Sequence, residues 1–284
     1  MKRLLTPLAL ISGLPLLFWQ LAFFAGAAVI LVSMTFWSVR NYQLVVDFSL
    51  ANWRAILKSS LFYSIYARTV GYCLFASALA SVLAFPFAYG LAFKTSRRTQ
   101  RIALMLLIIP YFTSYLVRSY SWRFMLEHDG IVNYALRALG METYEFQGSF
   151  ASVIIGYFGY FLPIVALIQL LGLQNIDKQY LEAANNLGAR RFRSVFTVVV
   201  PLARGALLVG FAFAFMMALG DFVSPAFVGG GARPTLSILI VNSIQGQSNF
   251  PKAAAISVVM LLTLVAVFFA INRAVFTQRG PRRG

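Results

Sequence analysis

The chain has 284 residues, of which 60% are hydrophobic and 11% are charged, and its formal net charge is +16. Because soluble domains carry about 25% charged residues, this composition excludes an ordinary soluble domain. Cys73 is the only cysteine, which excludes an intrachain disulfide and a cysteine-based metal cluster.

Six apolar runs are long enough to cross the roughly 30 Å hydrocarbon core of a bilayer as helices. They lie at residues 16–37, 67–93, 102–121, 151–172, 205–227 and 252–273. Lys2 and Arg3 precede the first run, as they would in a cleavable signal, but the run continues to Trp37, beyond the roughly 7–15 apolar residues of a signal. We therefore expect a retained first span and an all-α membrane protein with six transmembrane helices.

The basic residues are distributed unevenly between the two sides that six spans define. The N-terminus, the loops 94–101 and 173–204, and the tail from Arg273 hold 15 of the 24 basic residues. Because Lys and Arg are enriched in cytoplasmic loops, we expect these segments, and so both termini, in the cytoplasm. This topology accounts for the net charge, so nucleic acid is not expected as a partner.

The opposite side carries three kinds of connection. Residues 51–66 form an amphipathic piece that we expect at the membrane interface. Residues 122–150 mix acids with aromatics and predict short helices between turns. In the last connection Gly229, Gly230 and Gly231 are expected to end the fifth span, and a short helix is predicted around 235–245.

The loop 173–204 is unusually polar for this chain and predicts two short helices. Asp177 is a suitable N-cap, because its carboxylate can accept the free amides of a first helical turn. Gly188 is suited to a left-handed C-terminal turn, and Pro201 is expected to end the second helical piece, 189–199. One apolar face is predicted for the first helix, formed by Tyr180, Leu181, Ala184 and Leu187.

This loop resembles the signature of the transmembrane permease subunits of binding-protein-dependent ABC importers. That signature is E-A-A, three residues, G, nine residues, then I-x-L-P. The chain has Glu182-Ala183-Ala184, then Gly188, then Val198-Val199-Val200-Pro201 at the same spacing, with valine at both aliphatic positions. The resemblance extends from about residue 60 to residue 275.

The resemblance implies a type I importer fold and a set of partners. In this family the loop forms a coupling helix that docks on a cytoplasmic ATPase dimer, which binds ATP-Mg; no cofactor is expected on the present chain. A second permease subunit, a solute-binding protein outside the membrane and a small-molecule solute complete the expected system. The residues expected to act in coupling to the ATPase are Glu182, Ala183, Ala184, Gly188, Arg190 and Pro201.

Further segments resemble the spermidine/putrescine branch of this family, namely Leu116-Val117-Arg118-Ser119-Tyr120 with Trp122, and Gly220-Asp221-Phe222-Val223-Ser224-Pro225 with Gly229-Gly230. This likeness implies a polyamine or a similar small cation as solute, a second permease that is a different chain, and a location in a bacterial inner membrane. The expected organisation is a first span with an outer amphipathic segment at 1–60, the importer transmembrane domain at 61–275 and a basic cytoplasmic tail at 276–284.

Local physics alone leaves a second reading of the loop open. A short helix with arginines beside it could lie on the membrane surface, with its basic groups against anionic lipid headgroups. The spacing of the signature favours coupling to an ATPase over this interfacial role.

Asp221 is the one acid predicted inside a span, near the outer end of the fifth. Such an acid is costly in lipid and usually faces the bundle interior or water, so a role in the path of a cationic solute is one interpretation. A bond to local backbone near Pro225, or to Arg118, is the other. Tyr157 and Tyr160 in the fourth span could hold an ammonium group by cation–π attraction, or could serve helix packing only.

Two other classes of function fit the residues less well. A membrane-embedded enzyme would need clustered acids, histidines or a nucleophile–base pair, whereas the sole histidine, His128, lies in an outer loop. An ion-coupled secondary transporter of small solutes, the principal alternative, would show internal repeats and more buried ionisable groups. The chain has no phosphate-binding G-x-x-x-x-G-K-[ST] loop, so we expect ATP hydrolysis on a separate subunit and no enzymatic activity here.

Overall fold

The structure is a computed structural model that describes residues 7–276. The segments 1–6 and 277–284, and with them most of the predicted basic tail, lie outside the described residues. The chain divides into two compact units: one contains the residues up to Phe62 together with Leu239–Leu262, and the other contains Tyr63–Ile238 and the residues from Thr263 onward.

The first unit begins with a long helix whose apolar residues are largely exposed within the chain. Its elements are α1 (Pro7–Gln20), a π-helical turn η1 (Leu21–Ala25) and α2 (Gly26–Met34). Residues 14–34 form an apolar span of which none is buried within the chain. An apolar helix without a protein neighbour is stable only where lipid or another chain covers it.

A β-hairpin and a short helix follow this span. Strands β1 (Ser38–Arg40) and β2 (Gln43–Val45) pair antiparallel, with Val39 opposite Leu44. Asn41 and Tyr42 both have positive φ, as a two-residue type I′ turn requires, but Asn-Tyr lacks the glycine that signals such a turn, so the hairpin was not predicted. The predicted amphipathic piece 51–66 is divided between α3 (Ala51–Leu57) and the first turns of α4.

The other elements continue in chain order. They are α4 (Ser60–Lys94), α5 (Arg97–Ile108), the 3₁₀ turn η2 (Ile109–Phe112), α6 (Tyr115–Met125), α7 (Ile131–Ala138), α8 (Phe150–Gln174), α9 (Lys178–Asn186), α10 (Arg191–Ser194), the π-helical turn η3 (Val195–Val199), α11 (Val200–Gly220), the π-helical turn η4 (Ser224–Val228), α12 (Leu236–Gln245) and α13 (Phe250–Phe276). The helix predicted around 235–245 is confirmed as α12.

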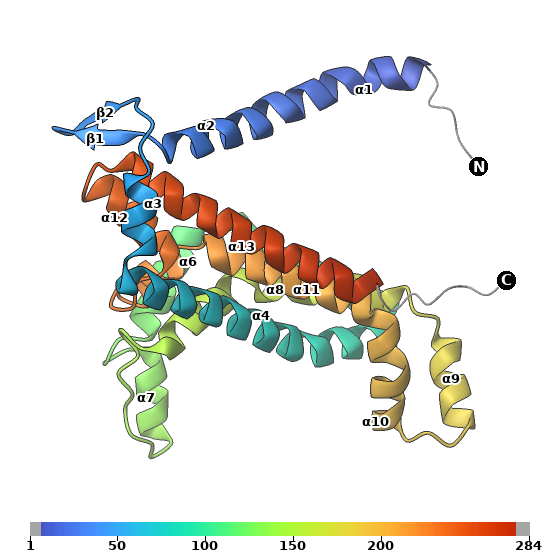
Figure 1. Ribbon diagram of the computed structural model, residues 1–284. Coiled ribbons are helices and arrows are strands. Elements are labelled where there is room, and N and C mark those ends of the chain that lie inside the picture. Colours follow the sequence, from blue (N-terminus) through green and yellow to red (C-terminus); the bar gives the residue numbers. More distant parts are fainter. Residues whose placement is uncertain (1–6, 277–284) are drawn as a thin grey trace. The chain divides into compact units, whose positions relative to one another are not determined.

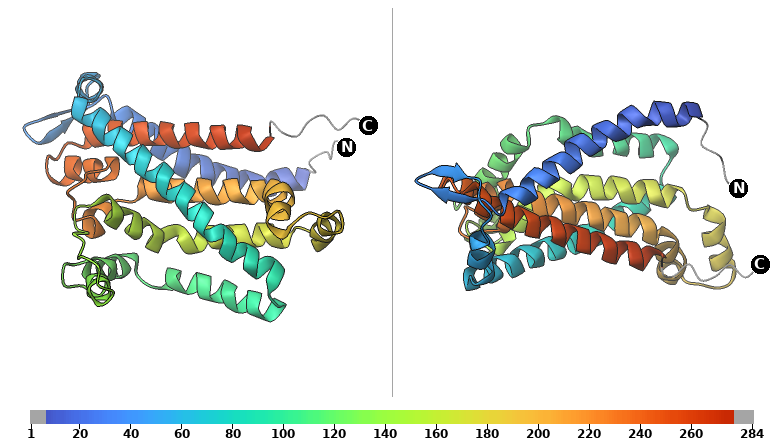
Figure 2. Two further views of the ribbon diagram at one scale, coloured as in Figure 1. Left: turned by 90° about the horizontal axis from the view of Figure 1, so that it is seen from below. Right: turned by 45° about the horizontal axis from the view of Figure 1, so that its top comes forward.

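Helices α8 and α11 pack along much of their length and form the centre of the second unit (Figures 1 and 2). Small residues allow this approach: a Cβ added to Gly172 would lie 2.1 Å from the Cβ of Ala206. Close backbone contact of this kind gives membrane helices dispersion energy that lipid tails would otherwise supply. The small residues of α8 and α11 therefore fix the framework that carries both ends of the unit.

The third span is broken, contrary to the prediction of one helix over 102–121. Helices α5 and α6 meet at an angle of 93°. Pro110 lies at the start of η2, and Thr113 is extended with ψ of 147°. A proline contributes no amide donor and clashes with the preceding turn, so it favours such an interruption. Within residues 7–276, five helices are long and apolar enough to span a membrane, or six if this bent pair counts as one span.

The fifth span also differs from its prediction at both ends. Pro201 does not end a helical piece, because the helix runs from Phe192 through η3 and α11 to Gly220. The π-helical turn η3 explains this continuity: the amide of Val200 bonds to the carbonyl of Val195, and this wider turn accommodates a proline that has no amide of its own. The span ends at Gly220, and not at the glycines 229–231, because Asp221 is extended with ψ of 121°.

Candidate functional site

The short helix α9, in the loop between α8 and α11, begins and ends at the residues that the sequence predicts. The Oδ1 atom of Asp177 accepts a hydrogen bond of 3.0 Å from the amide of Gln179, which caps α9. Gly188 has φ of +80°, and its amide bonds to the carbonyl of Asn185 at 2.9 Å. The amide of Ala189 bonds to the carbonyl of Ala184 at 3.0 Å, so the helix closes with a Schellman motif.

Helix α9 buries none of its residues within the chain, and Figure 1 shows it standing apart from α4, α8 and α11 at one end of the second unit. The predicted single apolar face is divided between two directions. Leu181 packs inward against a hydrophobic cluster, whereas Tyr180 and Leu187 are 57% and 89% exposed. Phe192, which follows the turn, is 78% exposed. The loop therefore presents apolar side chains outward on a short, well-capped helix.

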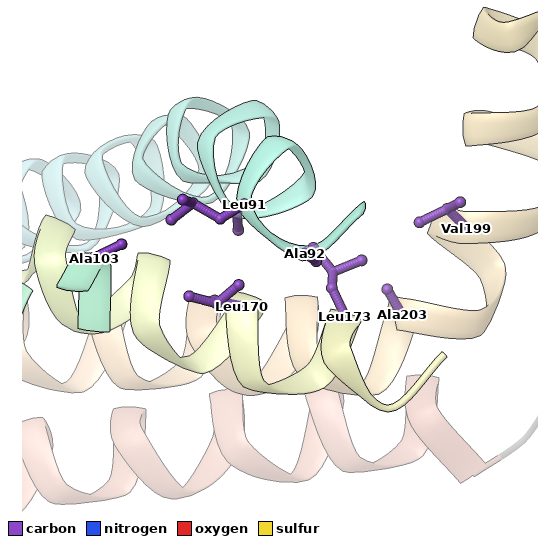
Figure 3. Close-up of a cluster of buried hydrophobic side chains, with 8 residues drawn as sticks. Leu91, Ala92, Ala103, Leu170, Leu173, Val199 and Ala203 are labelled. Atoms are coloured by element: carbon purple, nitrogen blue, oxygen red, sulfur yellow. The ribbon is translucent and has the colours of Figure 1, made fainter. Parts of the chain in front are cut away.

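A cluster of buried side chains fixes the base of this loop. Its members come from α4, α5, α8, η3 and α11 and are Ala88, Leu91, Ala92, Ala103, Leu170, Leu173, Val199 and Ala203. Figure 3 shows Leu173 on α8 beside Ala203 on α11. The buried Gln100 of α5 connects two further helices: it donates a hydrogen bond to the carbonyl of Leu91 on α4 at 2.9 Å and accepts one from Gln174 on α8 at 3.2 Å. The base of the loop is therefore packed against α4, α5, α8 and α11.

The predicted coupling residues lie along the outside of this loop. Glu182, Ala183, Gly188, Arg190 and Pro201 are exposed and Ala184 is half-buried. Among the side chains that the structure describes, Glu182 forms no ion pair.

Asp221 lies at the opposite end of α11 and joins two segments. Its Oδ1 accepts hydrogen bonds from the amides of Val223 at 2.8 Å and Ser224 at 3.3 Å, so it caps the turn that leads into η4. Its Oδ2 accepts a bond of 2.5 Å from the Tyr115 hydroxyl on α6. Only 5% of Asp221 is exposed. Of the two bonding partners considered from the sequence, local backbone is the one observed.

Tyr115 belongs to a group of aromatic side chains around the break in the third span. Its ring stacks on Tyr160 of α8, with centroids 4.2 Å apart and planes inclined by 23°. The Tyr111 hydroxyl donates to the Tyr160 carbonyl at 3.0 Å. The guanidinium carbon of Arg118 lies 5.9 Å from the Tyr111 ring centroid and 5.8 Å from that of Tyr115. We call Tyr111, Tyr115, Tyr160 and Arg118 the tyrosine cluster.

The two aromatic residues singled out from the sequence occupy different surroundings. Tyr160 belongs to the tyrosine cluster, whereas Tyr157 is fully buried and its hydroxyl has no hydrogen-bond partner among the described residues. Sequence reasoning missed Tyr111 and Tyr115. Tyr115 precedes Arg118 by three residues on α6, a spacing that places both on one helix face, whereas Tyr111 lies across the break in η2 and required the structure.

The family to which these features belong follows from comparison with known proteins. Residues 80–277 match the family described as the inner membrane component of binding-protein-dependent transport systems. The chain belongs to this family. The match contains the whole loop 173–204 with its E-A-A and glycine positions, and also every residue of the tyrosine cluster.

Relatives of this permease support the assignment over nearly the whole chain. It is 29% identical over 275 residues to the inner membrane ABC transporter permease protein YdcU of Escherichia coli, covering 90% of this chain and 85% of the relative. It is 27% identical over 229 residues to the spermidine/putrescine transport system permease protein PotB of Escherichia coli, covering 80% and 82%. A putative 2-aminoethylphosphonate permease, PhnU of Salmonella paratyphi A, is 24% identical over 270 residues and covers 89% and 90%.

The fold agrees with solved importers. A chain of a bacterial alginate ABC transporter, crystallised with a periplasmic protein bound to an alginate pentasaccharide, superposes with a TM-score of 0.76 at 15% identity, covering 96% of both chains. The superposition confirms the type I importer fold. The family match confirms that the chain is a permease subunit of an ABC importer and a multi-pass protein of an inner membrane. The family is a transport component, which agrees with the expectation that this chain is not an enzyme and disfavours the ion-coupled alternative.

Proposed function

We propose that this permease couples to a cytoplasmic ATPase dimer through the loop 173–204 and conducts a small organic cation of the polyamine class. ATP-Mg would bind to the ATPase. Closure of the ATPase pair would push on α9, and the cluster at the base of the loop would transmit the displacement to the spans. The solute would reach the permease from a binding protein outside the membrane.

One observation carries the coupling proposal: α9 is capped at both ends and anchored at its base through Leu181, yet it leaves most of its side chains exposed. Tyr180, Leu187 and Phe192 offer exposed apolar area, which suits a helix-in-groove contact with a folded partner. The exposed Glu182 and Arg190 supply charge at the edge of that surface. A helix lying on lipid headgroups would instead turn its apolar side chains to one side, whereas here they point in two directions.

The solute class is supported by the relatives. PotB is named for spermidine and putrescine, and PhnU for 2-aminoethylphosphonate, so both names describe solutes that carry an ammonium group. An acid and three tyrosines at the outer end of the spans suit such a group. In this scheme Tyr160 and Asp221 belong to the solute path, and the fully buried Tyr157 supports the wall behind them.

The proposed orientation places both termini, the 94–101 loop and α9 in the cytoplasm, and α6, α7 and α12 toward the binding protein. The charge asymmetry of the loops supports this orientation. A second permease, a different chain in keeping with the PotB likeness, would complete the path, and lipid would cover the remaining apolar surface.

Uptake by the reconstituted system tests the proposal. Vesicles would contain this permease with the second permease and the ATPase that co-purify with it from the native membrane, and the co-purifying binding protein would be added outside. We expect labelled putrescine or spermidine to enter the vesicles only when ATP is enclosed in the lumen, where the ATPase lies. Uptake that persists on an ion gradient without ATP would contradict ATP coupling, and ATP-driven uptake of neutral or anionic solutes alone would contradict the solute class.

A further inference from the structure

Arg118 is a cation held without an acid. Among the described residues no carboxylate lies within ion-pair distance of its guanidinium. Its Nη1 donates one hydrogen bond, to the Pro110 carbonyl at 2.5 Å, and its Nε is buried without a partner. Its guanidinium carbon lies 5.9 Å from the Tyr111 ring centroid and 5.8 Å from that of Tyr115. A buried donor left unpaired is costly, so this position is a poor one for a purely structural arginine.

The rings that hold this guanidinium are themselves fixed. The Tyr111 hydroxyl is bonded to the backbone of α8, and the Tyr115 ring is stacked on Tyr160. The Tyr115 hydroxyl donates to the carboxylate of Asp221, which also accepts the amides of Val223 and Ser224. Donation to a carboxylate polarises a phenol and makes its ring richer in electrons, so Asp221 strengthens the attraction of Tyr115 for a cation without touching that cation.

We propose that Tyr111 and Tyr115, the latter with its ring stacked on Tyr160, form a binding site for an alkylammonium group, which Arg118 occupies as a resident cation until a solute displaces it. The presence of a guanidinium against two rings shows that the site accommodates a cation. When the Arg118 side chain leaves the site, it loses a single hydrogen bond, and its unpaired Nε becomes able to bond to water. The role of this site in transport rests on the proposed function, whereas the site itself is defined by the rings and not by the transported solute.

The location of the cluster suits an exchange of cations. Arg118 is half-buried on α6, one turn beyond the extended residues Thr113 and Ser114. Tyr111 is 37% exposed, so one wall of the site is open at the surface of this chain. Arg118 can therefore leave by rotation of its own side chain while the hydrogen bonds of Tyr111 and Tyr115 stay in place.

Direct binding of labelled putrescine tests the site. The probe would be added to the purified permease–ATPase complex in nanodiscs, without the binding protein. We expect weak binding to the parent, because Arg118 competes for the site. Arg118→Gln, which removes the charge, should bind putrescine at least about tenfold more tightly, and Arg118→Lys, which keeps it, should bind like the parent. Tyr111→Leu added to Arg118→Gln should abolish the gain, whereas Tyr111→Phe should retain most of it.

The possible results separate the site from the proposed function. A gain of binding in Arg118→Gln that depends on Tyr111 supports the site, even if the parent complex transports no amine. An assembled Arg118→Gln complex without any gain contradicts the site, even if the parent transports putrescine. Arg118→Met replaces Arg118→Gln if the latter fails to assemble. If both fail while Arg118→Lys assembles, the charge is a structural requirement and Arg118 is not a displaceable occupant.

Discussion

The hydroxyl of Tyr115 donates a hydrogen bond to Oδ2 of Asp221, a residue 106 positions further along the chain. This bond connects α6, beyond the break in the third span, to the residue at which α11 ends. A hydrogen bond to a carboxylate contributes about 1.5–3 kcal/mol when it is well formed, so the two segments are expected to move together.

Removal of the Asp221 charge should weaken solute passage more than assembly. In Asp221→Asn the amide can still accept the Val223 amide through its oxygen, but Tyr115 loses its charged acceptor. We expect uptake at limiting solute to fall about tenfold, which corresponds to about 1.4 kcal/mol, with a normal yield of the complex. Ser224→Ala removes the 2.8 Å contact between the Ser224 and Tyr115 hydroxyls but keeps the charged Asp221 acceptor, so it is the control and should change uptake less than about twofold. Normal uptake by Asp221→Asn would assign Asp221 a structural role only.

Replacement of Gly188 should impair coupling through the backbone. Its φ of +80° is a conformation that Asn tolerates and that β-branched residues strongly disfavour, and a Cβ there meets no atom within 4 Å. Gly188→Val should therefore strain the Schellman turn and lower both uptake and the ATP turnover stimulated by the binding protein, by about tenfold or more. Gly188→Asn should retain most of both rates. Equal rates in the two variants would show that the turn geometry is not needed for coupling.

Packing between α8 and α11 should be sensitive to a single methyl group. A Cβ at position 172 would lie 2.1 Å from the Cβ of Ala206, whereas a Cβ at Gly205 meets nothing within 4 Å. Gly172→Ala is expected to destabilise the permease by about 1–3 kcal/mol through overpacking, and Gly205→Ala to leave it unchanged or slightly more stable. Thermal unfolding in detergent measures both. Equal midpoints for Gly172→Ala and the parent would contradict the close contact.

The proposed orientation can be checked by cysteine labelling in a Cys73→Ala background. Asn186 at the end of α9 and Thr143 beyond α7 are both exposed, and Figure 1 shows α9 and α7 at opposite ends of the second unit. An impermeant maleimide added to intact cells should label Thr143→Cys, while Asn186→Cys should react only after the membrane is opened. The reverse pattern would invert the topology.

The sequence was most informative where local chemistry decides structure. The Asp177 cap and the left-handed turn at Gly188 depend on nearby backbone groups, so their residue types were sufficient to predict them. The break after Pro110 and the passage of a helix through Pro201 were not predictable, because a proline either interrupts a helix or is absorbed by a π-helical turn, depending on packing. The meeting of Tyr115 with Asp221 depends on that break and therefore required the structure.

Photo-cross-linking from α9 tests most directly whether the loop 173–204 binds the ATPase. A benzoylphenylalanine would replace Leu187, which is 89% exposed, in cells that contain the whole transport system. The control position is Leu139 at the end of α7, which is 75% exposed at the other end of the unit. We predict that illumination joins the permease to the ATPase from position 187 and not from position 139. An inserted, active permease that yields no ATPase adduct from position 187, or yields one equally from position 139, would contradict the account.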